Sequence, residues 1–570
     1  MSYAHNQRLL LATTCIGGLA CMAQVPEHDW TRHWGGNGDD HNGGLVVDVE
    51  GNVYSLSTVF PGCTIDTASH SPWISAHGAT DIQLLKYDTL GHVIWGGKAG
   101  GSGYDSGSGI AIATDGALYV IGYIKGAADM DLTIQGSWPV EPIAEDDIVL
   151  ARYSPDGAVQ WAFAMGGPDD DWGYGVAATH DGGVLVTGYF QDSMDVDPDT
   201  ASIVMRYSNG DKDIFIAKYT ASGALEWANV VGGPEGDVAY AIDADDAGNA
   251  YITGYFRQLV DFDPGPAEHL LQYSCSRAYL ASYTSTGAYR WAFAFGASCQ
   301  SSGNCVRTTP SGDVYATGRF GYTSDFDPGP ELHQLNATEN GAAYLAKYDS
   351  AGQYLWAVNY GTKSSTGYAL DIDASGTVYT AGTFFGPMDA APGPDSCILV
   401  GTPGNADLFA SKFSAEGVWQ WSGAVTGEGH NRAPRIRQHG GNVYLSGDYS
   451  VNADFDLGPS EVLTDPVDKH GIFLARYTPA SESMVAIPQT ASIPSVGIHP
   501  NPASSFARLS GLDGLSDARL TLCDALGRVI HREAISTGHT LLDVRYLPKG
   551  AYLVRIEGSS FLRTGKLLVE

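Results

Sequence analysis

The chain has 570 residues, enough for a large domain and a small one, and its 64 acidic against 31 basic residues give a formal net charge of −33. So acidic a chain repels phosphate backbones and anionic lipid, which excludes nucleic acid and anionic membrane surfaces as expected partners. Its 72 glycines and its low charged fraction of 17% favour a turn-rich all-β protein and argue against disorder.

Residues 1–23 have the pattern of a signal peptide. Arg8 ends a short polar region, residues 9–20 are mostly apolar, and Cys21-Met22-Ala23 offers a small-x-small cleavage site. The apolar run is too short to span a bilayer, and no other stretch is a transmembrane candidate. Cys21 also allows a lipoprotein, although Gly18-Leu19-Ala20 is a poor lipobox. We therefore expect the chain to be exported.

One unit recurs between residues 30 and 477, and its clearest copy is Asp213–Phe262. That copy holds four runs of alternating apolar residues, DIFIAKY, ALEWANVV, AYAIDAD and AYITGYF, which predict four short strands. Turn residues such as Gly223 and Gly248-Asn249 separate them. The tryptophan of the unit occurs seven times, at Trp34, Trp95, Trp161, Trp227, Trp291, Trp356 and Trp421.

A four-stranded unit with this period is typical of a propeller blade, because radial repetition leaves only short, protected sheet edges. The alternative is an open β-solenoid, whose coils are usually shorter. The chain enters the repeat at a tryptophan strand near residues 30–35 and leaves it at Gly471–Tyr477, with no tryptophan strand after it. We therefore predict a seven-bladed β-propeller over residues 24–477, in which the N-terminal strand completes the seventh blade. Runs of the AYAIDAD type are expected innermost and the tryptophan runs outermost.

The recurring phrases GNxYxTG, DIFxAKY and WA…GG resemble the bacterial seven-bladed β-propeller repeat family of the SBBP type. The resemblance covers residues 30–477 and implies the fold more firmly than a function, because one fold hosts many functions.

Acidic residues occur in the links that join the first four blades, where the chain reaches the mouth of the predicted central channel. They are Asp40, Asp105, Asp171 and Asp237, and the later links carry Ser302, Ser365 and Asn431 instead. An acidic half-ring on this loop face would attract cations or a basic ligand. The alternative is that these acids only hydrate the loops and cap strands.

A second acidic motif, DxD, follows the second strand of most units. Its copies are Asp129 with Asp131, Asp195 with Asp197, Asp261 with Asp263, Asp325 with Asp327, and Asp454 with Asp456, and a degenerate copy stands at Asp389. Residues i and i+2 of an extended segment project to the same side, so each carboxylate pair converges, and calcium would relieve the repulsion. The alternative is that the aspartates bond backbone amides to hold the turn that follows.

The cysteines and the search for catalytic motifs give little information about function. Cys299 and Cys305 are expected in one loop, and their spacing allows a disulfide in an oxidising compartment but lacks the histidines of a zinc site. The sequence contains no GxSxG, HExxH or phosphate-binding glycine loop, so no catalytic residue is named. Carboxylate pairs for glycoside hydrolysis are abundant on the loop face, and nothing singles one out.

Residues 478–495 are rich in Ser, Ala, Thr and Pro and predict a linker. Residues 496–570 then hold nine basic and seven acidic residues, so the acidity of the chain lies before them. Several short strands separated by turns at 524–527 and 548–550 predict a small β-sandwich.

The phrases of this tail resemble the type A C-terminal sorting domain of the type IX secretion system. They are His499-Pro500-Asn501-Pro502, LCDALGRVI, LPKGAYLVRI and KLLV, although the family usually has an aromatic residue where His499 stands. The resemblance implies that the sorting signal includes Pro500, Asn501, Pro502, Gly527, Gly550 and Lys566. It further implies export across the outer membrane of a Bacteroidota-like bacterium, recognition of the tail by the type IX translocon, and its usual removal.

The sequence thus favours a secreted or cell-surface propeller that acts as a non-catalytic binding or scaffold module for a protein or glycan ligand. One alternative is an extracellular polysaccharide-acting enzyme that uses carboxylates of the loop face. It draws on the fact that the repeat is broken most clearly at Cys299–Cys305 and Gly427–Arg437. Another alternative is a calcium-dependent adhesin.

Overall fold

The computed structural model describes residues 25–569 except 36–37, 66–77, 134–135, 145, 200–201, 297–300, 339–340, 362–363, 393–395, 451, 459, 464–470, 481–496, 500, 511–517, 524–528, 536–540 and 559–560. Every regular element in these residues is a β-strand. The chain divides into two compact units, Met1–Ser481 and Glu482–Glu570, and the division falls inside the segment predicted as a linker. The signal-peptide prediction concerns residues outside the described ones.

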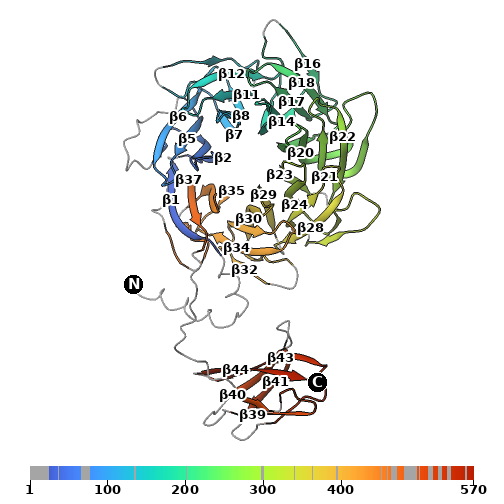
Figure 1. Cartoon of the computed structure of the whole chain (residues 1–570). Coiled ribbons are helices and arrows are strands. Elements are labelled where there is room, and N and C mark those ends of the chain that lie inside the picture. The colour runs from blue at the N-terminus through green and yellow to red at the C-terminus, as the bar shows by residue number, and fades with distance from the viewer. Residues whose placement is uncertain are drawn as a thin grey trace. The chain divides into compact units, whose positions relative to one another are not determined.

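The first unit is a ring of seven blades, each with four antiparallel strands in the same order (Figure 1). The innermost strands are β2 (His41–Val47), β7 (Ser106–Ile112), β13 (Trp172–Ala178), β19 (Val238–Ala244), β23 (Ser302–Thr308), β29 (Ser365–Ile372) and β35 (Arg432–His439). The second strands are β3 (Val53–Val59), β8 (Leu118–Lys125), β14 (Val184–Phe190), β20 (Ala250–Asp261), β24 (Val314–Phe320), β30 (Val378–Phe385) and β36 (Asn442–Tyr449). Each inner strand contacts the inner strands of the blades beside it, and β2 contacts β35, so the ring is closed.

The third strands carry the DIFIAKY run and the outermost strands carry the tryptophan. The third strands are β5 (Asp81–Tyr87), β11 (Asp146–Tyr153), β17 (Asp213–Tyr219), β21 (Leu270–Tyr283), β27 (Ala342–Tyr348), β33 (Ala406–Phe413) and β37 (Gly471–Thr478). The outermost strands are β6 (Val93–Gly101), β12 (Val159–Met165), β18 (Leu225–Val231), β22 (Tyr289–Phe295), β28 (Tyr354–Tyr360), β34 (Trp419–Val425) and β1 (Glu27–Gly35). This order confirms the predicted all-β propeller and the predicted strand order within each blade. Blade 1 begins at β2, and blade 7 consists of β35, β36, β37 and β1.

Short strands extend the blades on the loop side. They are β4 (Thr64–Ile65) beside β1, β9 (Ala128–Asp129) beside β6, β10 (Pro139–Val140) beside β9, and three hairpins. The hairpins pair β15 (Ser193–Asp195) with β16 (Met205–Tyr207), β25 (Thr323–Asp325) with β26 (Gln334–Asn336), and β31 (Pro387–Asp389) with β32 (Ile398–Val400). In blade 4 the same hairpin is a continuation of β20 and β21.

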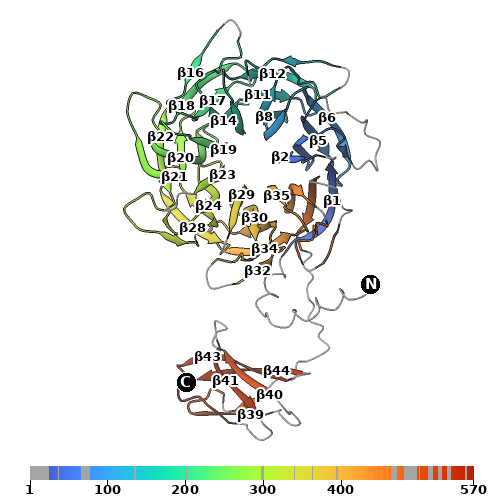
Figure 2. The same ribbon diagram turned by 180° about the vertical axis from the view of Figure 1, so that it is seen from behind.

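The N-terminal strand closes the ring as predicted. β1 pairs antiparallel with β37 from Glu27↔Thr478 to Trp34↔Ile472, and both views place the blue β1 beside the orange β37 (Figures 1 and 2). One detail of the repeat assignment differs. Trp30, rather than Trp34, stands opposite the basic residue of β37, as Trp227 stands opposite Lys218 in β17.

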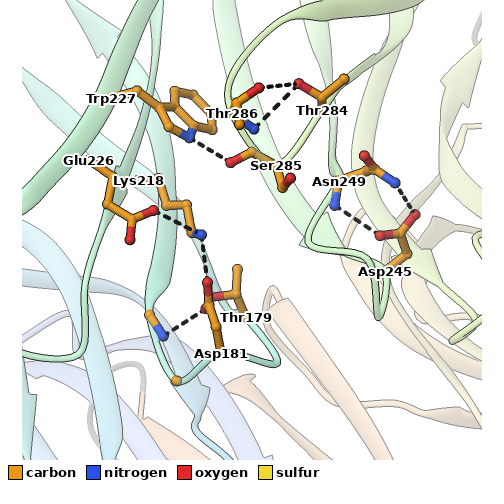
Figure 3. A network of polar contacts seen from close by, with 12 residues as sticks. Thr179, Asp181, Lys218, Glu226, Trp227, Asp245, Asn249, Thr284, Ser285 and Thr286 are labelled. Atoms are coloured by element: carbon orange, nitrogen blue, oxygen red, sulfur yellow. Dashed lines mark hydrogen bonds and ion pairs between the residues drawn. The ribbon is translucent and has the colours of Figure 1, made fainter.

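The repeated tryptophan and glycine form one contact between neighbouring blades. The indole Nε1 of Trp227 donates to the carbonyl oxygen of Ser285 at 2.9 Å, in the hairpin turn of the next blade (Figure 3). The turn glycine beside it, Gly287, has a φ of +83°, and a Cβ there would come within 2.8 Å of the same indole. Trp30, Trp95, Trp161, Trp291 and Trp356 make the equivalent hydrogen bond to the next turn. The seam therefore requires both residues, which explains why they recur together.

Charged residues join the strands within a blade. Lys218 is nearly buried, and its Nζ lies 2.7 Å from Asp181 and 2.9 Å from Glu226 (Figure 3). Buried apolar and aromatic side chains between adjacent sheets, such as Tyr219 and Phe215, make up the cores of the blades.

The second unit contains two antiparallel sheets. One has the order β38 (Gly497–His499), β39 (Phe506–Ser510) and β42 (Leu541–Asp543). The other has the order β41 (Val529–Ile535), β40 (Ala518–Cys523), β43 (Gly550–Gly558) and β44 (Phe561–Val569). Buried residues of both sheets, including Leu509, Leu520 and Val554, form one core, as a small β-sandwich requires.

Candidate functional site

The four acids of the blade links are buried, not solvated. Asp40, Asp105, Asp171 and Asp237 are each 0% exposed. Each accepts a backbone N–H from the residue 20 positions further on, where the repeated part of the second strand ends, and Asp237 also accepts one from its own link. The link acids are therefore neither a solvated half-ring nor hydrated loop groups, and their hydrogen bonds at the end of the second strand fit only the part of the alternative in which they cap strands.

The same position is polar and buried in the other three blades. It is occupied there by Ser301, Ser365 and Asn431, so the residue equivalent in blade 5 is Ser301 and not Ser302. This position therefore has a structural role: its side chain joins the link between blades to the backbone of the blade. Three of its carboxyl groups are harder to ionise than usual: burial raises the pKa of Asp105 to about 6, of Asp237 to about 7 and of Asp171 to about 8.

The DxD loops share one hydrogen-bonding plan. In the blade 4 copy, Oδ1 of Asp261 accepts the N–H groups of Asp263 and His269, at 3.0 and 2.8 Å, and Oδ1 of Asp263 accepts that of Gly265 at 2.8 Å. Phe262, between the two acids, is fully buried, and its carbonyl accepts the hydroxyl of Tyr283 at 3.0 Å. The loop is thus closed by its own carboxylates.

The other four complete copies repeat these contacts. In blade 2, Oδ1 of Asp129 accepts the N–H groups of Asp131 and Trp138, and Oδ1 of Asp131 accepts that of Thr133. The remaining three copies follow the same scheme. Oδ1 of the first acid, Asp195, Asp325 or Asp454, accepts the N–H of the second acid and one further along the loop. Oδ1 of the second acid accepts the N–H two residues on: that of Asp199 for Asp197, at 3.0 Å, that of Gly329 for Asp327, and that of Gly458 for Asp456, both at 2.7 Å. The turn-holding interpretation therefore describes every one of these pairs.

One DxD loop has further groups that would suit a cation. Ligand atoms of Asp327, Glu331 and His333 all lie within 4.8 Å of one another in blade 5. Calcium prefers oxygen ligands and six to eight of them, which this group does not supply by itself.

The remaining residues predicted to bind calcium do not gather into such a group. In the part of the chain that the structure describes, Asp195, Asp197, Asp261, Asp263, Asp454 and Asp456 belong to no cluster of three ligating side chains. The predicted metal role of Asp197 and Asp456 thus differs from the role that their hydrogen bonds show, which is to hold a turn. The physical reason is that the backbone N–H groups of the turn already relieve the repulsion that calcium was invoked to relieve. Calcium at the DxD loops stays a prediction.

The disulfide between Cys299 and Cys305 is not formed. Cys305 has a free, buried thiol, whereas Cys299 lies outside the described residues. The prediction placed both residues in one loop, but Cys305 belongs to the inner strand β23, in the cavity wall described next.

A cavity of about 470 Å³ lies at the axis of the ring, and all seven inner strands line it. The lining residues are Gly43, Gly44, Leu45, Ser108, Gly109, Ile110, Tyr174, Gly175, Val176, Tyr240, Ala241, Ile242, Ser302, Asn304, Cys305, Arg307, Arg319, Thr366, Tyr368, Ala369, Arg435 and Arg437. Its volume is within the range of small-molecule sites, and inner-strand residues of different blades converge on it.

The wall of the cavity is asymmetric. Blades 1 to 3 contribute glycines, Ser108, apolar residues and Tyr174, whereas the arginines come from blades 5 and 7. The inner-strand position that pairs with Tyr54 of β3, or with its equivalent, is apolar in blades 1 to 3. In blades 4 to 7 this row alternates acid and base, with Asp243, Arg307, Asp371 and Arg437. Aligning the seven inner strands with one another would have revealed this row, which the sequence predictions missed.

The two acids of this row join neighbouring inner strands. Oδ2 of Asp371 accepts the N–H of Gln438 at 2.8 Å, and Oδ2 of Asp243 accepts the N–H of Thr308 at 2.7 Å. Burial raises the pKa of Asp371, although the charges of Arg437 and Arg307 oppose that change. These acids therefore close the ring at its centre and also face the arginines.

In the second unit, Asn501 fastens the start of the tail to its last strand. Its Nδ2 donates to the carbonyl oxygen of Lys566 at 2.6 Å, and its Oδ1 accepts the N–H of Leu568 at 2.7 Å. Two residues of the predicted sorting signal thus meet in space. Pro502 and Gly550 are described but make no comparable contact with each other, while Pro500 and Gly527 lie outside the described residues.

Residues 497–570 match the family of secretion system C-terminal sorting domains. Proteins with this domain are exported by the type IX secretion system to the cell surface or the extracellular space, so the chain is a secreted protein whose tail interacts with that system. Within the described ranges, no helix is long and apolar enough to cross a membrane.

The propeller is similar to parts of larger proteins. An uncharacterized WD repeat-containing protein of Acanthamoeba polyphaga mimivirus is 24% identical over 327 residues, which are 48% of this chain and 24% of that protein. The regulatory protein FlaEY of Caulobacter vibrioides is 28% identical over 143 residues, 25% of this chain and 15% of that protein. The chain therefore spans at most about a quarter of these relatives. They support a repeat propeller, and the SBBP subtype stays a prediction.

Among solved structures, the extracellular domain of a putative one-component system of B. thetaiotaomicron aligns over 96% of this chain and 100% of its own, at 9% identity and a TM-score of 0.17. Prolyl oligopeptidase B of Galerina marginata aligns over 95% of this chain and 56% of its own, at 9% identity and a TM-score of 0.33.

Proposed function

We propose that the protein is a non-catalytic binding module that is secreted or displayed at the cell surface. Its propeller would bind a protein or glycan ligand at the axial cavity, and its tail would serve only for export. The axial cavity is the main observation behind the proposal, because the residues that line it differ from one blade to the next. The outermost strands keep the tryptophan, the turns before them keep the glycine, and the third strands keep a basic residue except at Ser282 of blade 4, whereas the inner strands differ from blade to blade. Residues that diverge within a repeat are free of the common structural duty and available for recognition.

The hydrogen bonds of the loop-face acids support a binding role over a polysaccharide-acting enzyme. A general acid and a nucleophile for glycoside hydrolysis need carboxyl groups directed at the sugar. The link acids are buried and accept backbone N–H groups, and the DxD acids hold their own turns. Neither set is aimed at a substrate.

A calcium-dependent adhesin is the second candidate, and the group formed by Asp327, Glu331 and His333 favours it. A cation there would connect the DxD turn of blade 5 to the residues that follow it. Such a role would be additional to the axial site, because this loop joins β25 to β26 and does not line the axial cavity.

The test is a screen of the full chain on a glycan array with neutral and acidic saccharides, paired with an assay for newly released reducing ends. We expect saturable binding to a subset of glycans without release of reducing ends. Turnover of any bound glycan would establish an enzyme. If the protein binds no glycan on the array and no purified protein component of the cell envelope, the binding-module proposal fails.

A further inference from the structure

Three arginine side chains of the axial cavity have no acidic partner at ion-pair distance among the described residues. Arg307, Arg435 and Arg437 each donate to the carbonyl oxygen of the residue before them, at 3.1, 3.2 and 2.8 Å. The arrangement differs from that of the basic residues on the third strands. Lys218, for example, contacts two carboxylates.

This concentration of positive charge is unexpected in a chain with 64 acidic and 31 basic residues. Lysine and arginine in such a protein have many carboxylates to pair with, and a charge held at a partly buried position without a partner is costly. Arg435 and Arg437 lie two residues apart on β35, and Arg307 lies on β23, two blades away along the ring. The three charges therefore converge on one cavity from separate elements.

The electrostatics of the cavity reflect their proximity. Burial lowers the pKa of Arg435, and burial together with the charge of Arg307 lowers the pKa of Arg437 to about 10. For Arg307, burial is outweighed by Cys305, Asp243 and Asp371, which raise its pKa. Asp243 and Asp371 carry negative charge that offsets the positive charge of Arg307 and Arg437, the two arginines of the same row. Arg435 stands in another row and leaves the cavity with a surplus of positive charge.

The rest of the wall suits the body of a small polar molecule. Ser108, Asn304 and Thr366 offer hydrogen-bonding groups. The rings of Tyr174 and Tyr240 meet edge to face with centroids 5.4 Å apart, and Tyr368 is 39% exposed. Flat aromatic faces beside hydroxyl and amide groups are suited to packing against a sugar ring.

We propose that the axial cavity is an anion-binding site in which Arg435, Arg437 and Arg307 hold the oxyanion of a small ligand, with an acidic monosaccharide unit as the ligand class. Guanidinium groups bind carboxylate, sulfate and phosphate through paired, charge-assisted hydrogen bonds. The inference rests on the proposed function, since it names the ligand class of that same site. It goes beyond the net charge of the chain, which by itself argues against an anionic ligand.

The test is isothermal titration calorimetry on the full chain at low ionic strength with sodium galacturonate, sodium sulfate, inorganic phosphate and glucose. We expect one site that binds at least one anion and does not bind glucose. Preference for galacturonate would assign a carboxylated sugar. Preference for sulfate or phosphate would support the anion site and assign the oxyanion to a sulfated or phosphorylated ligand.

Two variants locate the site. Arg435→Gln and Arg437→Gln should each weaken anion binding by about 10- to 100-fold, because each removes a hydrogen bond between charged groups. Arg545→Gln is the matched control: it removes the same charge from an exposed side chain in the other unit and should leave binding unchanged. If an arginine variant does not fold, Ser108→Asp places a negative charge in the opposite wall and should weaken binding as well.

The inference is overturned if no anion binds more tightly than glucose, or if the cavity variants fold and bind anions like the parent. Binding of a neutral glycan or a protein by the parent, without anion binding, would overturn the anion site while the binding-module proposal stands. If neither the glycan and protein screen nor the calorimetric titration detects binding, both the binding-module proposal and the anion-site proposal fail.

Discussion

Replacing Asp171 by asparagine should stabilise the propeller at alkaline pH and reduce the dependence of its stability on pH. Oδ1 of Asp171 accepts the N–H of Gln191 at 2.9 Å, and Oδ2 has no hydrogen-bond partner among the described residues. Oδ1 of Asp147 is buried without a partner as well, and its charge adds to the effect of burial on Asp171. The equivalent Asn431 of blade 7 shows how an amide satisfies this position. It accepts the N–H of Ser450 and donates to Asp407, both at 3.2 Å.

The sign follows from the pKa, which is raised from 3.8 to about 8 in the folded protein. A carboxyl group with a raised pKa takes up a proton on folding, so its contribution to the free energy of unfolding is largest below about pH 4. That contribution is lost as the pH rises through about 8. Between pH 5 and pH 8.5 the loss from Asp171 is at most about 4 kcal/mol, at 1.36 kcal/mol per pKa unit.

The assay is thermal unfolding of the full chain between pH 5 and pH 8.5, with Asp170→Asn as the control. Asp170 is the exposed neighbour of Asp171, so its replacement makes the same chemical substitution in the same link without altering the buried pair. For a unit of this size, about 1 kcal/mol corresponds to about 1 °C in Tm. At pH 8.5 we expect Asp171→Asn to melt up to about 4 °C above the parent, with the advantage shrinking towards pH 5. Parallel Tm curves, or a lower Tm for Asp171→Asn at pH 8.5, would refute the reasoning.

Four further predictions concern other parts of the chain. Deleting β1 should lower the Tm of the propeller markedly, because β37 loses its partner strand; a deletion that melts like the parent would contradict ring closure. Gly287→Ala should lower the Tm of the propeller by more than Gly126→Ala, because both glycines have φ near +83° but only Gly287 lies against an indole. Equal losses of Tm would contradict the proposed role of the contact between Trp227 and Gly287. If calcium binds the DxD loops, millimolar calcium should raise the Tm above that measured with a chelator, by mass action; an unchanged Tm would leave those acids as turn-holding groups. Removing residues 497–570 should abolish appearance of the protein in the medium or at the cell surface, and normal export would contradict their role as the sorting signal.

The sequence alone was sufficient for the architecture. Strand order, blade number and closure by β1 depend on local alternation, turn residues and the spacing of copies such as Asp213–Phe262, all of which are visible along the chain. The exception within the repeat was Trp34. Two tryptophans lie four residues apart on β1, and only the pairing with β37 shows that Trp30 is the equivalent one.

The environment of the functional groups depended on contacts between distant segments, which no local pattern encodes. The link acids look solvated in a glycine-rich stretch, yet Asp237 accepts the N–H of Arg257 from the far end of its hairpin and is buried there. Cys305 looked like a loop residue but lies on an inner strand. Arg307 and Arg437 are 130 positions apart in the sequence, and only the closed ring brings them to one cavity. The periodic sequence therefore determined the scaffold, because periodicity is a property of the chain. The tertiary structure decided burial, charge pairing and the axial site, because those depend on which blades face one another.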